Sequence, residues 1–396
     1  MELIHNRIRS SSKPGNRMDK YKIGLAIEGG GMRGAVSAGA AAAISLLGLS
    51  DAFDSVYGSS AGALIAAFFV SKQLNGTVIY SDILPRAGKK FLDRAQLIGA
   101  MAPLTIGERQ PVINLEYLLN DVVRKSVPLD WATFWRNNQV QPLTIIASGL
   151  NSMQSTALKS EAGHFDSFDS LLTCLRASMC VPGVAGPTVR LNVTLGEEPF
   201  ADALIFEPIP FRSAVDDGCT HVVALRTRPD GSEILGKKAS GFYEKWVAKR
   251  FLKHTNKCSA AALHMIRLDH IKQYAEDLLI LNEGSASRDG VLVPPNGKGG
   301  GRRVHLLPVA PPATCAEVDT LASSRSELVR GLKDGFSQAW DILGGDLTYR
   351  FPGNVVADQL FDVPDEHEFE KTWRHLGAMF QEMSVQQKRN MTAVMM

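Results

Sequence analysis

Apolar residues near the start of the chain form two similar blocks. Residues 21–27 (YKIGLAI) are a short apolar run that ends in glycines, and residues 35–47 are rich in alanine, which predicts a strand, a tight loop and a helix. The same order recurs as a short extended piece at residues 55–57 and an apolar helical stretch at residues 63–70. The sequence therefore predicts two consecutive strand-to-helix turns.

Two later runs, residues 143–147 (LTIIA) and 221–226 (HVVALR), are continuously β-prone rather than alternating. Such runs are typical of strands in a parallel sheet that is covered on both faces. Helical patterns separate the runs, which favours α/β architecture. The remaining predicted elements are helices at 115–125, 168–177 and 324–343 and a strand at 304–309.

The elements divide the chain into three expected parts. Residues 1–20 are a basic, serine-bearing leader that we expect to be disordered, with organelle targeting as the alternative. Residues 21–345 form one α/β domain, which includes a glycine-rich stretch at 285–303 that we expect to be loop or disorder. Residues 346–396 are a C-terminal extension to which the sequence assigns no role.

Composition excludes several classes of protein. The 396 residues are 45% apolar and 21% charged, as in globular proteins. The net charge of +2 creates no overall field for nucleic acid. No apolar run reaches the roughly 18 residues of a membrane span. Five scattered cysteines without CxxC spacing favour a reducing compartment and give no metal site. We expect a cytoplasmic or peripheral membrane protein without cofactor or nucleic-acid partner, whose oligomeric state the sequence leaves open.

The first chemical motif lies at the second strand-to-helix turn. Residues 58–62 (GSSAG) match G-x-S-x-G, in which a serine occupies a sharp turn between strand and helix. Gly58 and Gly62 let the backbone fold tightly beneath Ser60, and the following helix points its unpaired N–H groups toward an oxyanion. The pentapeptide alone occurs by chance in unrelated proteins. The predicted strand before it and helix after it favour Ser60 as a nucleophile.

The second motif, GGGMRG at residues 29–34, allows two interpretations. It satisfies the dinucleotide pattern G-x-G-x-x-G, and Asp51 and Asp54 follow at about the spacing of a ribose-binding acid. However, both aspartates precede the short strand that leads into the serine turn, whereas a ribose-binding acid closes a strand. The other interpretation is an anion-binding nest of exposed backbone N–H groups beside Ser60. Arg33 either begins the helix in solvent, or orients this loop and attracts an anionic head group.

Four motifs in order resemble the patatin-like phospholipase family: GGGMRG, GSSAG, ASMCVP at residues 177–182 and FADA at residues 200–203. The resemblance covers roughly residues 21–230 and extends more loosely to about 345. It implies a three-layer α/β/α sandwich with a mostly parallel central sheet. It also implies hydrolysis of lipid esters by a serine–aspartate dyad that uses no histidine, metal or cofactor.

Each site residue is assigned by its place in these motifs. Ser60 is the nucleophile, Asp202 is the base, and Ser178 and Pro182 shape the site. The oxyanion hole is the loop Gly29, Gly30, Gly31, Met32, Arg33 and Gly34. The chain departs from the family at Ala203, where glycine is usual. If that position needs a positive φ, alanine is strained there by about 1 kcal/mol, and a non-catalytic lipid- or partner-binding scaffold becomes the alternative.

An ordinary aspartate is a weak base for a serine hydroxyl at neutral pH. We therefore expect burial beside Phe200, Leu204 and Phe206 to raise the pKa of Asp202. A Ser-His-Asp triad with His164 or His221 is the alternative.

Basic and aromatic residues alternate from Lys237 to Lys257. On a helix they separate into an aromatic and a basic face, which suits contact with anionic lipid or a surface helix that packs its aromatics inward. The residues proposed for membrane contact are Tyr243, Trp246, Lys249 and Arg250. Together these motifs favour a phospholipase A-like or lysophospholipase-like enzyme that acts on a lipid or fatty-acyl ester, with a nucleotide-binding oxidoreductase as a further alternative.

Overall fold

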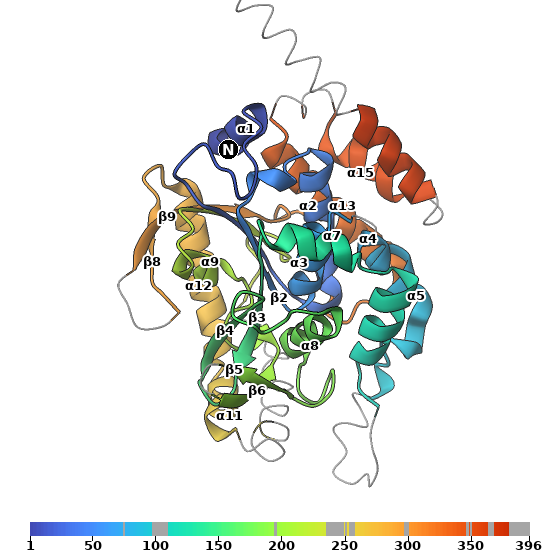
Figure 1. Cartoon of the computed structure of the whole chain (residues 1–396). Coiled ribbons are helices and arrows are strands. Elements are labelled where there is room, and N and C mark those ends of the chain that lie inside the picture. The colour runs from blue at the N-terminus through green and yellow to red at the C-terminus, as the bar shows by residue number, and fades with distance from the viewer. Residues whose placement is uncertain are drawn as a thin grey trace, which may run out of the picture.

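The computed structural model describes residues 1–73, 76–96, 110–193, 196–234, 249, 252, 258–296, 301–345, 348, 351–362 and 368–379. Within these residues nine strands form one sheet (Figure 1). The strands are β1 (Ile23–Ile27), β2 (Ser55–Ser59), β3 (Leu143–Gly149), β4 (Gln154–Lys159), β5 (Val189–Val193), β6 (Gly196–Ala201), β7 (His221–Leu225), β8 (Val291–Val293) and β9 (Arg302–Val309).

The sheet has a parallel centre and antiparallel margins. Its strand order is β5-β6-β3-β2-β1-β7-β9-β8, and β4 also pairs with β3. The five strands from β3 to β9 are parallel to their neighbours, whereas β4, β6, β5 and β8 join by antiparallel pairing. The central strands are covered on both faces, while β5 alternates between half-buried and exposed residues. The predicted α/β architecture is confirmed, with a sheet that is mixed as a whole.

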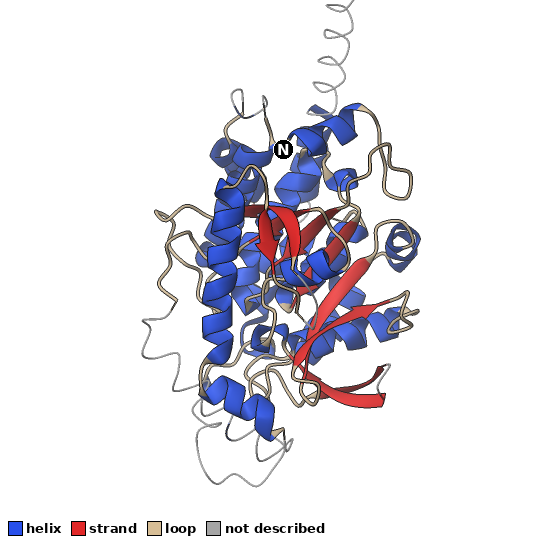
Figure 2. Ribbon diagram, turned by 90° about the vertical axis from the view of Figure 1, so that its left-hand side faces the viewer, coloured by secondary structure: helices blue, strands red, loops and turns tan. Residues whose placement is uncertain are grey.

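Helices lie on both sides of the sheet (Figure 2). The α-helices include α1 (Glu2–Arg9), α2 (Gly34–Leu46), α3 (Ala61–Val70), α4 (Gly76–Val78), α5 (Leu84–Ala87), α7 (Trp131–Asn138), α8 (Phe168–Met179), α9 (Phe211–Asp216), α11 (Ser259–Ile266), α12 (Asp269–Ala286), α13 (Arg325–Leu343) and α15 (Gly353–Phe361). The shorter or wider helical turns are η1 (Gly31–Arg33), η2 (Ser50–Ala52), η3 (Ile79–Ile83), η4 (Gly88–Lys90), η5 (Tyr117–Ser126) and η6 (Ala203–Ile205).

Side chains of β1 divide between the two cores, as the two-residue period of a strand requires. Leu25 and Ile27 belong to the larger core, which α2, α3, α8 and α13 share. Ala26, which points the other way, belongs to the core beneath α9 and α12. Since helices pack on both faces, the molecule is a three-layer α/β/α sandwich.

The first 20 residues differ from the expected disordered leader. They contain helix α1, and the side chain of Arg7 is only 1% exposed. Its guanidinium forms ion pairs of 2.8 Å with both Asp19 and Asp54. A buried arginine must be paired to offset the loss of hydration, and these two carboxylates fix the segment against the sheet.

The glycine-rich stretch also differs from the expectation. It contains strand β8 and the start of β9, which pair antiparallel. Val291 and Val293 point inward from β8 and are buried, so this short strand extends the sheet over the second core. Farther along the chain, α15 packs on α13, where Phe361 meets Phe336 with ring centroids 5.7 Å apart. Residues 368–379 are also helical.

Candidate active site

Ser60 lies at a sharp turn between β2 and α3. Its backbone has φ 52° and ψ −126°, a conformation that costs a non-glycine residue free energy and often marks functional sites. Gly62 allows the turn to approach β1, because a Cβ atom there would lie 2.2 Å from the carbonyl oxygen of Ile27. The turn presents the Ser60 side chain at the carboxyl edge of the parallel strands, where the serine motif predicted it.

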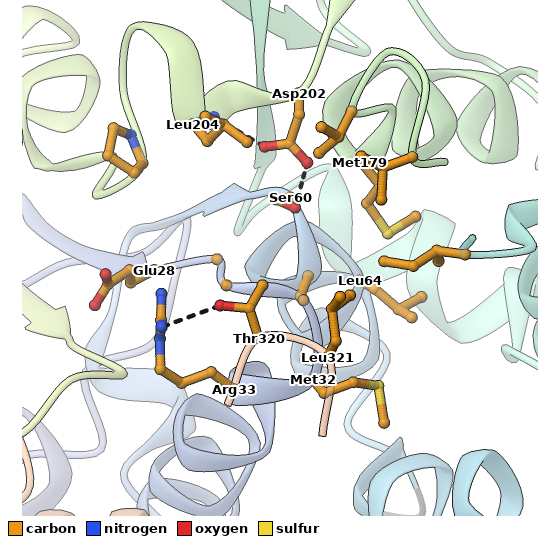
Figure 3. A pocket seen from close by; sticks show the side chains of 18 of the residues that line it. Glu28, Met32, Arg33, Ser60, Leu64, Met179, Asp202, Leu204, Thr320 and Leu321 are labelled. Atoms are coloured by element: carbon orange, nitrogen blue, oxygen red, sulfur yellow. Dashed lines mark hydrogen bonds between the residues drawn. The ribbon is translucent and has the colours of Figure 1, made fainter. Parts of the chain in front are cut away.

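Asp202 lies directly opposite Ser60 (Figure 3). It follows β6, and its Oδ2 accepts a hydrogen bond of 2.7 Å from the Ser60 hydroxyl. Its other oxygen, Oδ1, accepts a bond of 2.8 Å from the Leu204 N–H, and its own N–H donates to the Cys180 carbonyl at 2.8 Å. Two hydrogen bonds therefore hold the carboxylate and a third holds the Asp202 backbone, with one carboxylate oxygen directed at the serine.

Burial changes the acidity of this carboxyl group. Asp202 is 3% exposed, and burial raises its pKa to about 6, although the hydrogen bonds from Leu204 and Ser60 favour the ionised form. The direction agrees with the sequence-based expectation. An aspartate with this pKa is a stronger base than a solvated one and is still mostly ionised at neutral pH.

Ala203, the departure from the family pattern, fits its position without strain. It begins the short turn η6, and its φ angle is not positive. The methyl group is fully buried. The strain that motivated a non-catalytic scaffold is therefore not present in the backbone of Ala203.

The glycine-rich loop touches the serine turn. A Cβ atom on Gly29 would lie 2.4 Å from the Ser59 carbonyl oxygen and 2.7 Å from the Ser60 Cβ, so only glycine permits this contact. Gly30 and Gly31 follow with φ of 147° and 60°. Within the described residues their N–H groups donate to no protein acceptor. These two groups are available to an oxyanion.

The remaining N–H groups of the loop are occupied. Met32 donates to the Thr320 carbonyl at 3.0 Å, and Gly29 donates to the Pro208 carbonyl at 3.3 Å. Arg33 and Gly34 bond within the turn itself. Of the six loop residues predicted for an oxyanion hole, Gly30 and Gly31 are therefore the two whose N–H groups stay unpaired within the described residues.

Arg33 connects the loop to that second segment. The side chain is 7% exposed and donates to Thr227 Oγ1, Glu317 Oε1 and Thr320 Oγ1 at 3.1, 2.9 and 3.2 Å. Burial, followed by repulsion from Arg228, lowers its pKa from the ordinary arginine value. Of the two interpretations of Arg33, the structure matches the one in which it orients the loop. The segment that covers the loop, residues 317–321, carries no motif from which its position beside the site could be predicted.

Ser178 and Pro182 lie on the other side of the serine turn. The Ser178 hydroxyl accepts a hydrogen bond of 2.8 Å from the Ser60 N–H and donates to the Ile146 carbonyl in the middle of β3. Pro182 is buried in the turn that follows α8 and forms an isolated β-bridge with Gly186. Ser178 therefore fixes the backbone of the candidate nucleophile.

A second buried carboxyl group supports the segment after Asp202. Ser59 donates to the Glu207 carbonyl at 2.7 Å. The Glu207 side chain accepts bonds from the N–H and hydroxyl of Ser213, and burial raises its pKa to about 7. This network joins the serine turn to the start of α9, and sequence reasoning did not assign Glu207 this role.

The two rival site assignments do not fit the structure. Asp54 precedes β2 and binds Arg7 and Arg17, so it lies at the opposite end of the strands from the glycine loop. Neither His164 nor His221 borders the cavity at Ser60. His164 accepts from the Lys159 N–H, and His221 stacks on His305.

The membrane-contact prediction falls largely outside the described residues. Tyr243, Trp246 and Arg250 are not among them, and Lys249 is exposed. No helix in the described part of the chain has the length and apolar character needed to cross a bilayer.

Ser60 and Asp202 open onto a cavity of about 400 Å³. Most of its wall is apolar and comes from α3, from η3 to α5, and from residues around η5. Its polar wall includes Glu28, Arg228, His270 and Tyr274, none of which had a sequence signal. A deep, mainly apolar cavity with a few polar groups is typical of a small-molecule or lipid site.

A serine that donates to a buried carboxylate, beside unpaired N–H groups at the edge of a parallel sheet, is typical of a serine-dependent acyl hydrolase. Comparison with models of known families agrees, because residues 25–215 match the family described as patatin-like phospholipase. The matched part of the chain includes both loops and Asp202. The match supports lipid acyl hydrolysis in general.

One solved structure with similarity to the chain is the crystal structure of VipD from Legionella pneumophila. The two chains are 14% identical with a TM-score of 0.41, over 94% of this chain and 77% of that chain. A search of the curated proteins found no match.

Proposed function

We propose that the protein is a serine-dependent lipid acyl hydrolase of the phospholipase A or lysophospholipase type. The observation that carries this proposal is the 2.7 Å hydrogen bond from the Ser60 hydroxyl to Asp202 at the wall of a largely apolar cavity. The substrate is a lipid or other fatty-acyl ester. The reaction needs no metal or cofactor.

In the first half of the reaction, Ser60 Oγ attacks the ester carbonyl while its proton moves to Asp202 Oδ2. The oxygen that gains negative charge lies at the N–H groups of Gly30 and Gly31. The ester C–O bond then breaks, and the leaving alcohol takes the proton from Asp202. The product of this half is an acyl group on Ser60.

In the second half, Asp202 takes a proton from water as the water attacks the acyl-Ser60 carbonyl. Collapse of this intermediate releases the fatty acid, and the proton returns to Ser60. Leu204 keeps Asp202 oriented throughout, because its N–H binds the oxygen that does not exchange protons.

The direct test is hydrolysis of a long-chain acyl ester by wild-type protein, Ser60→Ala and Asp202→Asn. We expect each substitution to lower kcat by at least about 1,000-fold, as for nucleophiles and bases of serine hydrolases. Ser71→Ala is the matched control, because this buried serine bonds the Phe68 carbonyl away from the cavity. Equal activity in Ser60→Ala and wild type would reject the proposal.

A catalytically inactive lipid-binding scaffold is the second candidate, and the same experiment distinguishes it. Such a scaffold would bind the ester and release no fatty acid. Membrane contact through the residues from 243 to 250 remains a prediction, which lipid flotation would test.

A further inference from the structure

The cavity has different chemistry on the two sides of Ser60. Figure 3 shows Glu28 and Arg33 on one side of the serine and Leu64 and Met179 on the other. The apolar side continues through Ile79, Leu84, Phe91, Leu115 and Leu118. A substrate bound for attack by Ser60 therefore has an apolar part on one side and a polar part on the other.

Arg228 lies on the polar side. Its guanidinium carbon is 5.4 Å from the ring centroid of Tyr274, whose hydroxyl donates to Glu28 at 2.7 Å. Its Nε lies 3.4 Å from Glu317 Oε1. Among the described residues, Arg228 makes no hydrogen bond, and its Nε is buried without a hydrogen-bond partner. The mechanism above gives this arginine no role.

Neighbouring charges leave Arg228 poorly neutralised. Glu317 is closer to Arg33, at 2.9 Å, than to Arg228, so one carboxylate serves two guanidiniums. Glu28 is bound on both oxygens, by Tyr274 and by the Thr227 N–H, although its charge also attracts Arg33. Arg228 therefore contributes N–H donors to the cavity wall, and these donors have no hydrogen-bond acceptor among the described residues.

Guanidinium groups bind phosphate through paired, charge-assisted hydrogen bonds. The cavity volume of about 400 Å³ lies near the lower end of the range for ligand pockets, and the cavity has one apolar side. We propose that Arg228 binds the phosphate head group of a single-chain acyl ester whose acyl chain lies on the apolar side. This inference rests on the proposed hydrolase function and specifies its substrate.

The test compares two esters with the same acyl chain and different head groups, 1-palmitoylglycerol phosphate and neutral 1-palmitoylglycerol. Arg228→Gln removes the charge, and Arg228→Lys keeps it without the paired donors. Arg288→Gln is the matched control, because Arg288 is exposed and does not line the cavity. KM and kcat are measured for each ester at concentrations below micelle formation.

We expect Arg228→Gln to raise KM for the phosphate ester about 10- to 100-fold, the effect of losing charged hydrogen bonds, and to leave the neutral ester unchanged. Arg228→Lys should recover part of the loss, and Arg288→Gln should change neither ester. Equal effects on both esters, or none on either, would overturn the inference while leaving the hydrolase proposal intact.

If wild type hydrolyses neither ester, the hydrolase proposal fails and binding decides the subsite. Calorimetry of both lipids is carried out on Ser60→Ala with and without Arg228→Gln. A loss of affinity for the phosphate lipid alone supports the subsite. Unchanged affinity for that lipid rejects it.

Discussion

The N–H of Ser60 donates a hydrogen bond of 2.8 Å to the hydroxyl of Ser178. Ser178 in turn donates to the Ile146 carbonyl, so one side chain connects the serine turn to the middle of β3. This contact uses the Ser60 N–H, which therefore does not contribute to the oxyanion hole. It also helps to hold the unfavourable backbone conformation of Ser60.

Removing the Ser178 hydroxyl should allow the turn to shift. We expect Ser178→Ala to lower kcat about 10- to 100-fold with little change in KM, since small displacements of a reacting group cost this much. The unfolding free energy should fall by about 1–3 kcal/mol, because two buried groups lose their partner. Ser71→Ala should lose similar stability without the kcat effect. Equal kcat values for the two variants would contradict this role.

The pH dependence of catalysis follows from Asp202. Burial raises its pKa to about 6, and only the ionised form accepts the serine proton. We expect kcat/KM for a neutral ester to be constant above about pH 7 and to fall tenfold per pH unit well below pH 6. A profile that stays flat down to about pH 4 would show that Asp202 has an ordinary acidity or is not the base.

The same carboxyl group should destabilise the fold at neutral pH. Between about pH 4 and 6 the folded protein binds this proton more tightly than the unfolded chain, so stability falls as pH rises through that window. Asp202→Asn removes the ionisation, and we expect it to increase the unfolding free energy by about 1–3 kcal/mol at pH 8.

Urea denaturation at pH 4 and pH 8 measures this difference. The stabilisation by Asp202→Asn should be much smaller at pH 4, where the carboxyl is protonated in the folded protein and about half protonated in the unfolded chain. A gain of equal size at both pH values would point to packing rather than charge.

Arg33 should affect catalysis through the position of the glycine loop. Lysine keeps the charge but cannot reach Thr227, Glu317 and Thr320 together. We expect Arg33→Lys to lower kcat for a neutral ester about tenfold. Arg7→Lys is the matched control, because Arg7 is also buried and paired with two carboxylates but lies away from the cavity. Similar kcat values in the two variants would exclude a positioning role for Arg33.

Local sequence patterns were sufficient for the centre of the fold. β1, α2, β2 and α3 could be predicted because buried parallel strands are continuously apolar and the glycines between them permit only tight turns. The serine motif and the order of the aspartate motif led to Ser60 and Asp202. Their direct hydrogen bond depends on the packing of β6 beside β3, which no local pattern specifies.

Contacts between distant segments account for what the sequence did not reveal. Arg7 forms a buried ion pair with Asp54, and this contact holds the leader against the sheet although the leader's composition resembles that of a disordered segment. Arg33 donates to the hydroxyl of Thr320, which is distant in the sequence, and the Thr320 carbonyl accepts from the Met32 N–H. Arg228 also lacks a motif, since its significance comes from the cavity that it borders.

The most direct test of the central claim is labelling of the folded protein with a fluorophosphonate, followed by location of the modified residue by mass spectrometry. This reagent reports an activated serine without any choice of lipid. The account predicts labelling at Ser60 in wild type and its loss in Asp202→Asn. A folded wild-type protein that remains unlabelled, or one labelled at another serine, would contradict the proposed dyad.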